Sequence, residues 1–166
     1  LLFPPYLLKC EQAGLFDYVS AVCAATSLGV VVYNRDNAIY GVETIMRLCE
    51  RHANFVGFKD GYGDLEQLVS LCTQVGDRLS FIGGMPTAEV FATSYKSVGF
   101  STYSSAIYNF IPELATRYFR AVRSGDRAFT DRALRDFFQP YLALRNRRRG
   151  YAVSIVKAGM RITGRD

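Results

Sequence analysis

Short apolar runs recur along this chain at a nearly constant interval. They begin near positions 1, 28, 54, 79 and 100, which lie 27, 26, 25 and 21 residues apart. The clearest run, residues 28–33, is continuous and rich in valine, as is typical of a strand buried on both faces of a parallel sheet. Because the interval leaves room for one helix between successive strands, the pattern predicts a parallel α/β architecture.

The stretches between these runs have the periodicity of helices. Apolar side chains recur on one helical face within residues 16–23, 45–52 and 65–72, which we expect to be crossover helices.

After the last run the pattern changes to helices alone. Residues 111–123, about 127–147 and 152–162 each indicate a helix, with Ser124-Gly125-Asp126 and Gly150 as the breaks between them. The sequence therefore predicts a helical C-terminal extension.

Five strand-helix units fit either an open doubly wound sheet or five-eighths of a closed (β/α)8 barrel, which takes about 250 residues when complete. The chain starts directly with a strand, without an initiator Met or the charged region of a signal peptide. We therefore expect it to begin inside a larger protein. We predict a partial (β/α)8 TIM barrel, strands four to eight, with residues 1–110 as the C-terminal portion of the barrel and residues 111–166 as its last helix and the C-terminal helices.

The net charge of +5 is unevenly distributed. Residues 1–115 carry 7 Lys and Arg against 11 Asp and Glu, a net −4, whereas residues 116–166 carry 13 against 4, a net +9. The run Arg145-Asn146-Arg147-Arg148-Arg149 could bind nucleic acid or another anion, but it lacks interleaved aromatic residues. We favour a solvated helix face or an interface with acidic groups, and expect no nucleic-acid partner.

Cofactor and membrane chemistry have little support. No apolar run approaches the roughly 20 residues that cross a bilayer. His52 is the only histidine, which argues against a His-based metal site or a Ser-His-Asp triad. Four widely spaced cysteines lack the short pairs of zinc and redox motifs; we interpret them as reduced core residues and predict a cytoplasmic protein without metal or cofactor. They are Cys10, Cys23, Cys49 and Cys72.

Lys59 is the sharpest candidate for chemistry. It follows the apolar run Phe55-Val56-Gly57-Phe58, so it would lie at the carboxyl end of a strand, where functional groups gather in parallel α/β folds. Burial there lowers the pKa of a lysine, and a neutral amine can attack a ketone to form a Schiff base. The alternative is an ordinary lysine that reaches solvent or pairs with Asp60 or Asp64.

Tyr33 ends the preceding run and would lie beside Lys59 if the two strands pair. Its phenol could transfer protons, or it could cap the core with its hydroxyl bound to backbone. Weaker candidates for substrate contacts follow this run and the last two apolar runs, and Arg35 could instead form an ion pair with Asp36. These candidates are Asn34, Arg35, Asn37, Gly84, Ser104 and Ser105.

These residues together resemble a known superfamily. Tyr33-Asn34 at one strand end and Gly57-Phe58-Lys59-Asp60 at the next resemble the paired tyrosine and Schiff-base lysine of the dihydrodipicolinate synthase/N-acetylneuraminate lyase superfamily. Within it, the chain is similar to the 5-dehydro-4-deoxyglucarate dehydratase branch over nearly its whole length. The segments that carry this likeness are residues 31–38, 58–61, 82–89 and 150–159.

The resemblance implies a (β/α)8 barrel followed by C-terminal helices, and a homo-oligomer for the full-length protein. It implies that Lys59 forms a Schiff base with a six-carbon keto-diacid, which the enzyme dehydrates and decarboxylates, with Tyr33 transferring protons. The first three strands, which carry the family's Gly-Glu loop and a hydroxyl pair for the substrate carboxylate, would lie outside this chain. Residues 35–38 read Arg-Asp-Asn-Ala instead of the Val-Pro-x-Arg of the synthase branch, which favours the dehydratase branch.

Two other functions stay open at this point. A related Schiff-base pyruvate aldolase or synthase would share Lys59 and Tyr33. A non-catalytic α/β binding domain would use neither residue for chemistry. We expect the isolated chain to be inactive, since strands at both ends of a partial barrel lack a neighbour.

Overall fold

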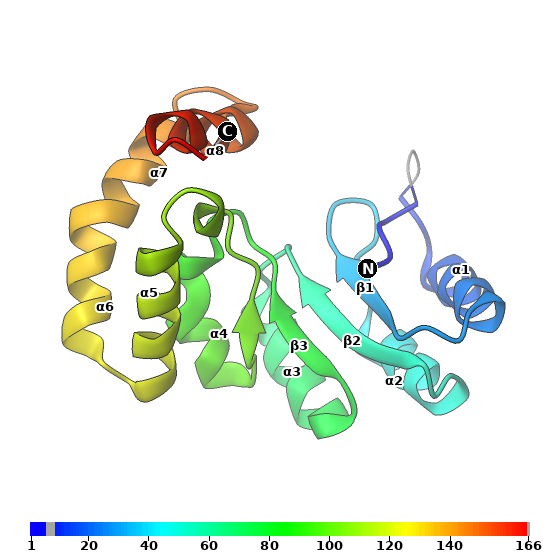
Figure 1. Cartoon of the computed structure of the whole chain (residues 1–166). Coiled ribbons are helices and arrows are strands. Elements are labelled where there is room, and N and C mark those ends of the chain that lie inside the picture. Colours follow the sequence, from blue (N-terminus) through cyan, green and yellow to red (C-terminus); the bar gives the residue numbers. More distant parts are fainter. Residues whose placement is uncertain (6–8, 166) are drawn as a thin grey trace. The chain divides into compact units, whose positions relative to one another are not determined.

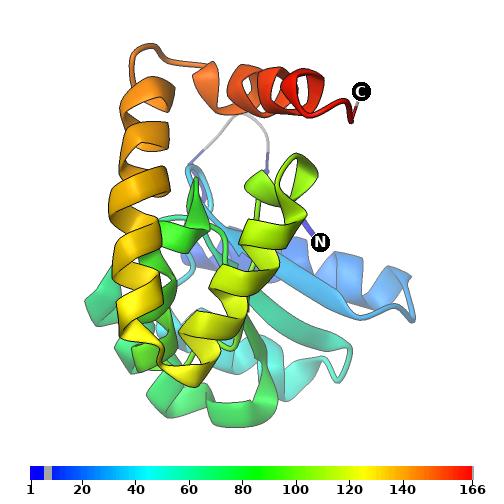
Figure 2. The same ribbon diagram turned by 60° about the vertical axis from the view of Figure 1, so that its left-hand side comes forward.

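The computed structural model describes residues 1–5 and 9–165, and Figures 1 and 2 show it from two directions. It divides into two compact units. The first consists of Leu1–Met85 and Ser97–Thr102, and the second of Pro86–Lys96 and Tyr103–Asp166.

A sheet with the strand order β1-β2-β3-β4 forms the centre of the first unit. β1 (Val30–Asn34), β2 (Phe55–Asp60) and β3 (Ser80–Gly83) pair in parallel. β4 has only two residues, Thr102–Tyr103. The parallel α/β architecture predicted from the apolar runs is therefore confirmed.

The first apolar run differs from its prediction. Instead of a strand, its described part forms an isolated parallel bridge between Leu2 and Val32. Leu2 N–H donates to the carbonyl of Val31 at 2.7 Å, and Tyr33 N–H donates to the carbonyl of Leu2 at 3.1 Å. Pro4 and Pro5 follow at once, and proline has no N–H to continue a ladder.

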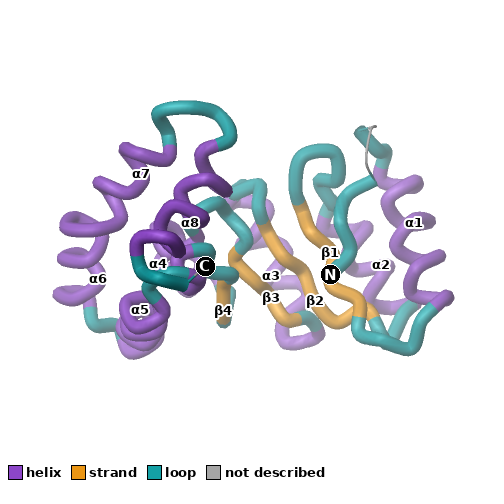
Figure 3. The backbone as a smooth tube through the Cα atoms, turned by 45° about the horizontal axis from the view of Figure 1, so that its top comes forward, coloured by secondary structure: helices purple, strands orange, loops and turns teal. Residues whose placement is uncertain are grey.

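Three helices alternate with the strands of this unit. They are α1 (Gln12–Ala25), α2 (Val42–Arg51) and α3 (Leu65–Val75). α1 packs beside α2 and α2 beside α3, a row that Figure 3 shows next to the strands. Their inward faces are fully buried with the aromatic residues of β2, so the apolar periodicity seen in the sequence forms the core of this unit. The core includes Leu15, Val19, Val32, Ile45, Leu48, Phe55, Phe58, Leu68 and Leu71.

The second unit is helical. It holds α5 (Pro112–Ser124), α6 (Arg127–Ala133), α7 (Gln139–Arg145) and α8 (Tyr151–Ile162). A π-helical segment, Leu134–Phe138, joins α6 to α7 into one continuous rod (Figure 2). The 3-10 turns η2 (Ala88–Phe91) and η3 (Ile107–Asn109) lie in this unit as well, whereas α4 (Ala92–Val98) spans the boundary between the units.

The breaks between these helices are those that the sequence predicts. Gly125 ends α5 in the left-handed conformation, with φ of 78°, which glycine adopts without strain. Asp126 then caps α6 by accepting from Phe129 N–H at 3.0 Å. After α7 the chain turns through residues 146–150 into α8, so the predicted helical extension is confirmed.

α8 packs through a close contact at a glycine. A Cβ on Gly159 would lie 2.7 Å from the ring of Phe110, so a larger residue would push α8 away from its neighbour. No residue of α8 is fully buried. In the described part of the chain no helix is both long enough and apolar enough to span a membrane.

Candidate active site

The strand register brings Tyr33 and Lys59 together. Tyr33 on β1 pairs directly with Lys59 on β2, and the lysine Nζ lies 4.6 Å from the centroid of the tyrosine ring. Both lie near the carboxyl ends of strands that contribute Val32, Phe55 and Phe58 to the core. This placement is the one expected from the spacing of the two apolar runs.

Lys59 is half-buried and has no acidic partner within residues 1–5 and 9–165. Burial lowers the pKa of its ammonium, and the nearby positive charge of Arg35 lowers it further. Among the residues that the structure describes, Lys59 forms no ion pair, and Asp60 is instead bound to Asn34, Tyr62 and Gly63. A larger fraction of Lys59 is therefore neutral at a given pH than of an ordinary lysine.

Gly84 gives the lysine side chain its space. A Cβ added to Gly84 would lie 2.7 Å from Lys59 Cε, 2.8 Å from Lys59 Cγ and 2.8 Å from the carbonyl oxygen of Asp60. The bare backbone after β3 therefore allows the lysine chain to pass.

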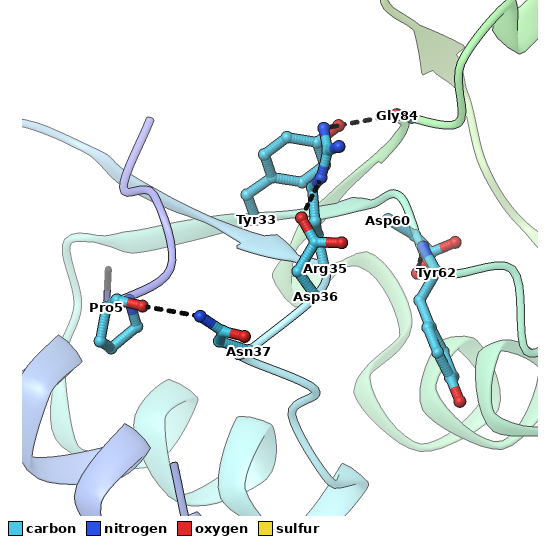
Figure 4. A network of polar contacts seen from close by, with 8 residues as sticks. All are labelled: Pro5, Tyr33, Arg35, Asp36, Asn37, Asp60, Tyr62 and Gly84. Carbon is cyan, nitrogen blue, oxygen red and sulfur yellow. Dashed lines mark hydrogen bonds and ion pairs between the residues drawn. The ribbon is translucent and has the colours of Figure 1, made fainter. Parts of the chain in front are cut away.

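The tyrosine hydroxyl is fixed from two sides (Figure 4). It donates to the carbonyl of Gly84 at 2.8 Å, and Arg35 Nη1 donates to its oxygen at 3.4 Å. Since the ring is buried, with 6% exposed, these two contacts hold the hydroxyl in one position, on the ring that Lys59 Nζ approaches. The backbone hydrogen bond that Tyr33 could make as a core-capping residue is therefore present.

Arg35 and Asn37 lie in the turn that follows β1. Arg35 Nε forms a solvent-exposed ion pair with Asp36 at 2.6 Å. This is the ion pair that the sequence offered as the alternative to a substrate contact by Arg35. Asn37 donates to the carbonyl of Pro5 at 3.5 Å (Figure 4), a long hydrogen bond.

Asn34 is completely buried, and its side-chain amide is occupied. It donates to Asp60 Oδ1 at 2.7 Å and accepts from Tyr40 N–H at 2.9 Å. Asp60 in turn accepts from Tyr62 and Gly63 N–H at 3.3 and 3.0 Å. This pair connects the turns after β1 and β2 and so supports the positions of Tyr33 and Lys59.

Ser104 and Ser105 belong to the second unit. Ser104 is exposed. Ser105 donates a short hydrogen bond to Glu89 and accepts from Tyr108 N–H at 3.2 Å. The Ser105 proton is thus engaged within the protein.

Glu89 is a residue that sequence reasoning missed. Its side chain is fully buried, and burial raises the pKa of its carboxyl. The hydroxyls of Tyr103 and Tyr118 are buried in the same unit without a hydrogen-bond partner among the described residues, as is Glu89 Oε2. Nothing in the pattern around position 89 distinguishes it from a surface glutamate on a turn.

Metal-binding groups do not gather in the described residues: no cluster of three or more His, Cys, Asp or Glu side chains could hold an ion there. The nitrogen and oxygen atoms brought together by the three strand ends are a lysine amine, a phenol, a guanidinium and backbone carbonyls. This set can form and protonate a carbon-nitrogen double bond.

Known proteins match the chain over its full length. The family described as "Dihydrodipicolinate synthetase family" matches residues 1–166. A protein named "Probable 5-dehydro-4-deoxyglucarate dehydratase" from Bradyrhizobium sp. (strain ORS 278) is 55% identical over 166 residues, which are 100% of this chain and 53% of that protein. One of the same name from Methylobacterium radiotolerans is 57% identical over 165 residues, 99% of this chain and 54% of its own length.

Solved structures show the same fold. Dihydrodipicolinate synthase from Oceanobacillus iheyensis superposes with a TM-score of 0.85 at 23% identity, covering 98% of this chain and 53% of that one. A putative dihydrodipicolinate synthetase from Pseudomonas aeruginosa gives a TM-score of 0.80 at 27% identity, with 99% and 56% covered. The chain thus spans about half the length of the proteins it matches.

Proposed function

Because this chain belongs to the dihydrodipicolinate synthetase family, we propose that it forms part of a Schiff-base lyase that converts 5-dehydro-4-deoxyglucarate into 2,5-dioxopentanoate, carbon dioxide and water. The observation that carries the proposal is the lysine at the end of β2. Lys59 has a lowered pKa and no ion-pair partner among the described residues, and it lies against a tyrosine whose hydroxyl is fixed. The names of the relatives support this substrate.

The reaction begins with the amine. Neutral Lys59 Nζ attacks the ketone carbon next to a carboxylate, and loss of one water gives an iminium. Tyr33 transfers the protons that this step moves between nitrogen and oxygen, since its hydroxyl lies beside the amine. The guanidinium of Arg35, 3.4 Å from the phenol oxygen, stabilises negative charge there during the transfer.

The iminium then supplies the electron sink for two bond cleavages. A proton leaves the adjacent methylene carbon, the resulting enamine expels the hydroxyl from the next carbon as water, and a conjugated iminium forms. The bond to the remote carboxylate then breaks, carbon dioxide leaves, and its electron pair flows through the conjugated carbons to nitrogen. Reprotonation and hydrolysis by one water release 2,5-dioxopentanoate and the free lysine, and need no cofactor.

The remaining site residues follow from the same proposal. Gly84, next to Lys59, allows the substrate to approach the backbone. Arg35 and Asn37 contribute to the pocket for the diacid from the turn after β1, and Asn34, at the end of β1, supports that turn through its hydrogen bond with the Tyr40 N–H. Ser104 and Ser105, the other substrate contacts predicted from the sequence, belong to the second unit, where the Ser105 hydroxyl donates to Glu89.

The architecture and setting are part of the proposal. The bridge at Leu2 and the four strands of the sheet correspond to consecutive strands of a (β/α)8 barrel, strands four to eight in the numbering of the whole. The chain alone is inactive because the first three strands complete the site. Relatives twice as long support this arrangement. The complete enzyme is a cytoplasmic homo-oligomer with a small-molecule substrate and neither nucleic-acid nor membrane partners.

Trapping tests the proposal. The complete enzyme is incubated with the keto-diacid and sodium borohydride, and peptides are analysed by mass spectrometry. We expect a reduced adduct on Lys59, and none in the matched variant Lys59→Arg, which keeps the charge but cannot form an imine. An unmodified Lys59 in the wild-type protein would identify a non-catalytic binding domain.

Gas release separates the two Schiff-base functions. The dehydratase releases one carbon dioxide for each keto-diacid consumed. A pyruvate aldolase or synthase, which the same tyrosine and lysine would serve, gives a trapped adduct with pyruvate and no carbon dioxide from the diacid. The second result would show that the proposed substrate is wrong, whereas the proposal that Lys59 forms a Schiff base would still hold.

A further inference from the structure

A pocket of about 440 Å³ lies in the second unit, at the turn between α7 and α8. Figure 2 shows this turn at the end of the rod formed by α6 and α7. Arg145, Arg148 and Arg149 line it, and none of its lining residues is acidic. Three of the four arginines in the run 145–149 therefore line one pocket. They are not spread along the solvent-exposed face of a helix.

Arg145 is held in place by neutral groups. Its Nη1 donates to the carbonyl of Pro86 at 3.0 Å and to Thr87 Oγ1 at 2.6 Å, and its Nε donates to Asn146 at 3.1 Å. These contacts fix the guanidinium without neutralising its charge. A preorganised cation of this kind loses little side-chain entropy when it binds an anion.

Arg148 and Arg149 are exposed and form no ion pair with the residues that the structure describes. Three guanidiniums around one pocket repel each other, and an anion between them removes that repulsion. The pocket continues to Tyr151, the first residue of α8. The helix has no side-chain cap and no acidic residue in its first turn, so nothing there opposes negative charge.

We propose that this pocket binds a small, multiply charged oxyanion, either a phosphate or a dicarboxylate. The arrangement favours a small ligand over a nucleic acid because three arginines line one open pocket and, among the described residues, Tyr151 is the one aromatic residue that lines it. None of its lining residues is among those to which the Schiff-base chemistry is assigned.

Calorimetric titration of the complete enzyme tests the site. Inorganic phosphate and glutarate are titrated separately into wild type, into Arg148→Ala/Arg149→Ala, and into Arg147→Ala/Arg161→Ala. The second double variant has the same change in net charge, and its two arginines are exposed and do not line the pocket. Because all four side chains are exposed, both variants are expected to fold, which circular dichroism checks.

We expect saturable binding of at least one anion, weakened roughly tenfold in the pocket variant and about twofold or less in the control. The anion that binds more tightly identifies the ligand class. Equal weakening in both variants, or no binding to wild type that depends on Arg148 and Arg149, would overturn the proposal. Tighter binding of a single-stranded oligonucleotide that also needs Arg147 and Arg161 would instead indicate a nucleic-acid surface.

Discussion

Replacing Gly84 by alanine tests whether the bare backbone after β3 is what positions the lysine. The added Cβ would lie 2.7 Å from Lys59 Cε and 2.8 Å from the carbonyl oxygen of Asp60. The lysine chain can move, but the carbonyl belongs to β2, so the strand ends must also shift. Overpacking of this kind costs about 1–3 kcal/mol, and the carbonyl of Gly84 that accepts from Tyr33 moves with it.

Two measurements follow the change. Urea unfolding of the complete enzyme should show a free energy of unfolding lower by about 1–3 kcal/mol. The rate of borohydride trapping at Lys59 should fall at least about tenfold, since a misplacement of about 1 Å can cost a factor of a hundred.

Gly14 provides the matched control. It lies inside α1, and a Cβ there would meet no atom within 4 Å, so Gly14→Ala should raise stability by about 0.5–1 kcal/mol and leave trapping unchanged. If Gly84→Ala were as stable as wild type and trapped at the full rate, the steric account of this position would be wrong.

Three further outcomes are expected. Tyr33→Phe keeps the buried ring but loses the hydrogen bond to Gly84, so stability should fall by about 1 kcal/mol while the rate of imine formation falls at least about tenfold, measured by denaturation and trapping. Asn34→Ala removes one of the hydrogen bonds to buried Asp60 and the side-chain acceptor of the Tyr40 N–H, so the free energy of unfolding should fall by about 2–4 kcal/mol. Glu89 has a raised pKa in the folded chain, so the unfolded state releases its proton first, and the free energy of unfolding falls as pH rises from about 4.5 through the folded pKa. Glu89→Gln should remove this part of the pH dependence when unfolding is measured across that pH range. An unchanged pH profile in the variant would contradict the assignment to Glu89.

The order of elements could be predicted because burial on both sides of a strand leaves a mark in the sequence. The valines of β1 and the apolar run of β2 show where each of these strands ends. Because the two strands pair in parallel, Tyr33 and Lys59 at these ends could be predicted to lie side by side. The helix breaks at Gly125 and Gly150 were readable for a similar reason, since backbone conformation there depends on one residue type.

What could not be predicted depends on tertiary contacts. Glu89 is polar, and its complete burial depends on residues distant in the sequence, such as Tyr118. The short first run became a single bridge at Leu2 because two prolines follow it. The hydrogen bond that the Ser105 hydroxyl donates to Glu89 depends on the geometry of a turn, which residue types alone do not predict.

The limited packing of α8 against Phe110 determines how easily this helix should detach in solution. A helix with no fully buried side chain has little to lose on detaching, so its amide protons should exchange with solvent by local opening, well before the rod of α6 and α7 unfolds. An anion held by arginines on the turn would bind only the attached form. Deuterium uptake along Tyr151–Ile162 would then slow as the fraction of chains with an anion in the pocket increases. The exchange rate of α8 would therefore report whether the pocket is occupied.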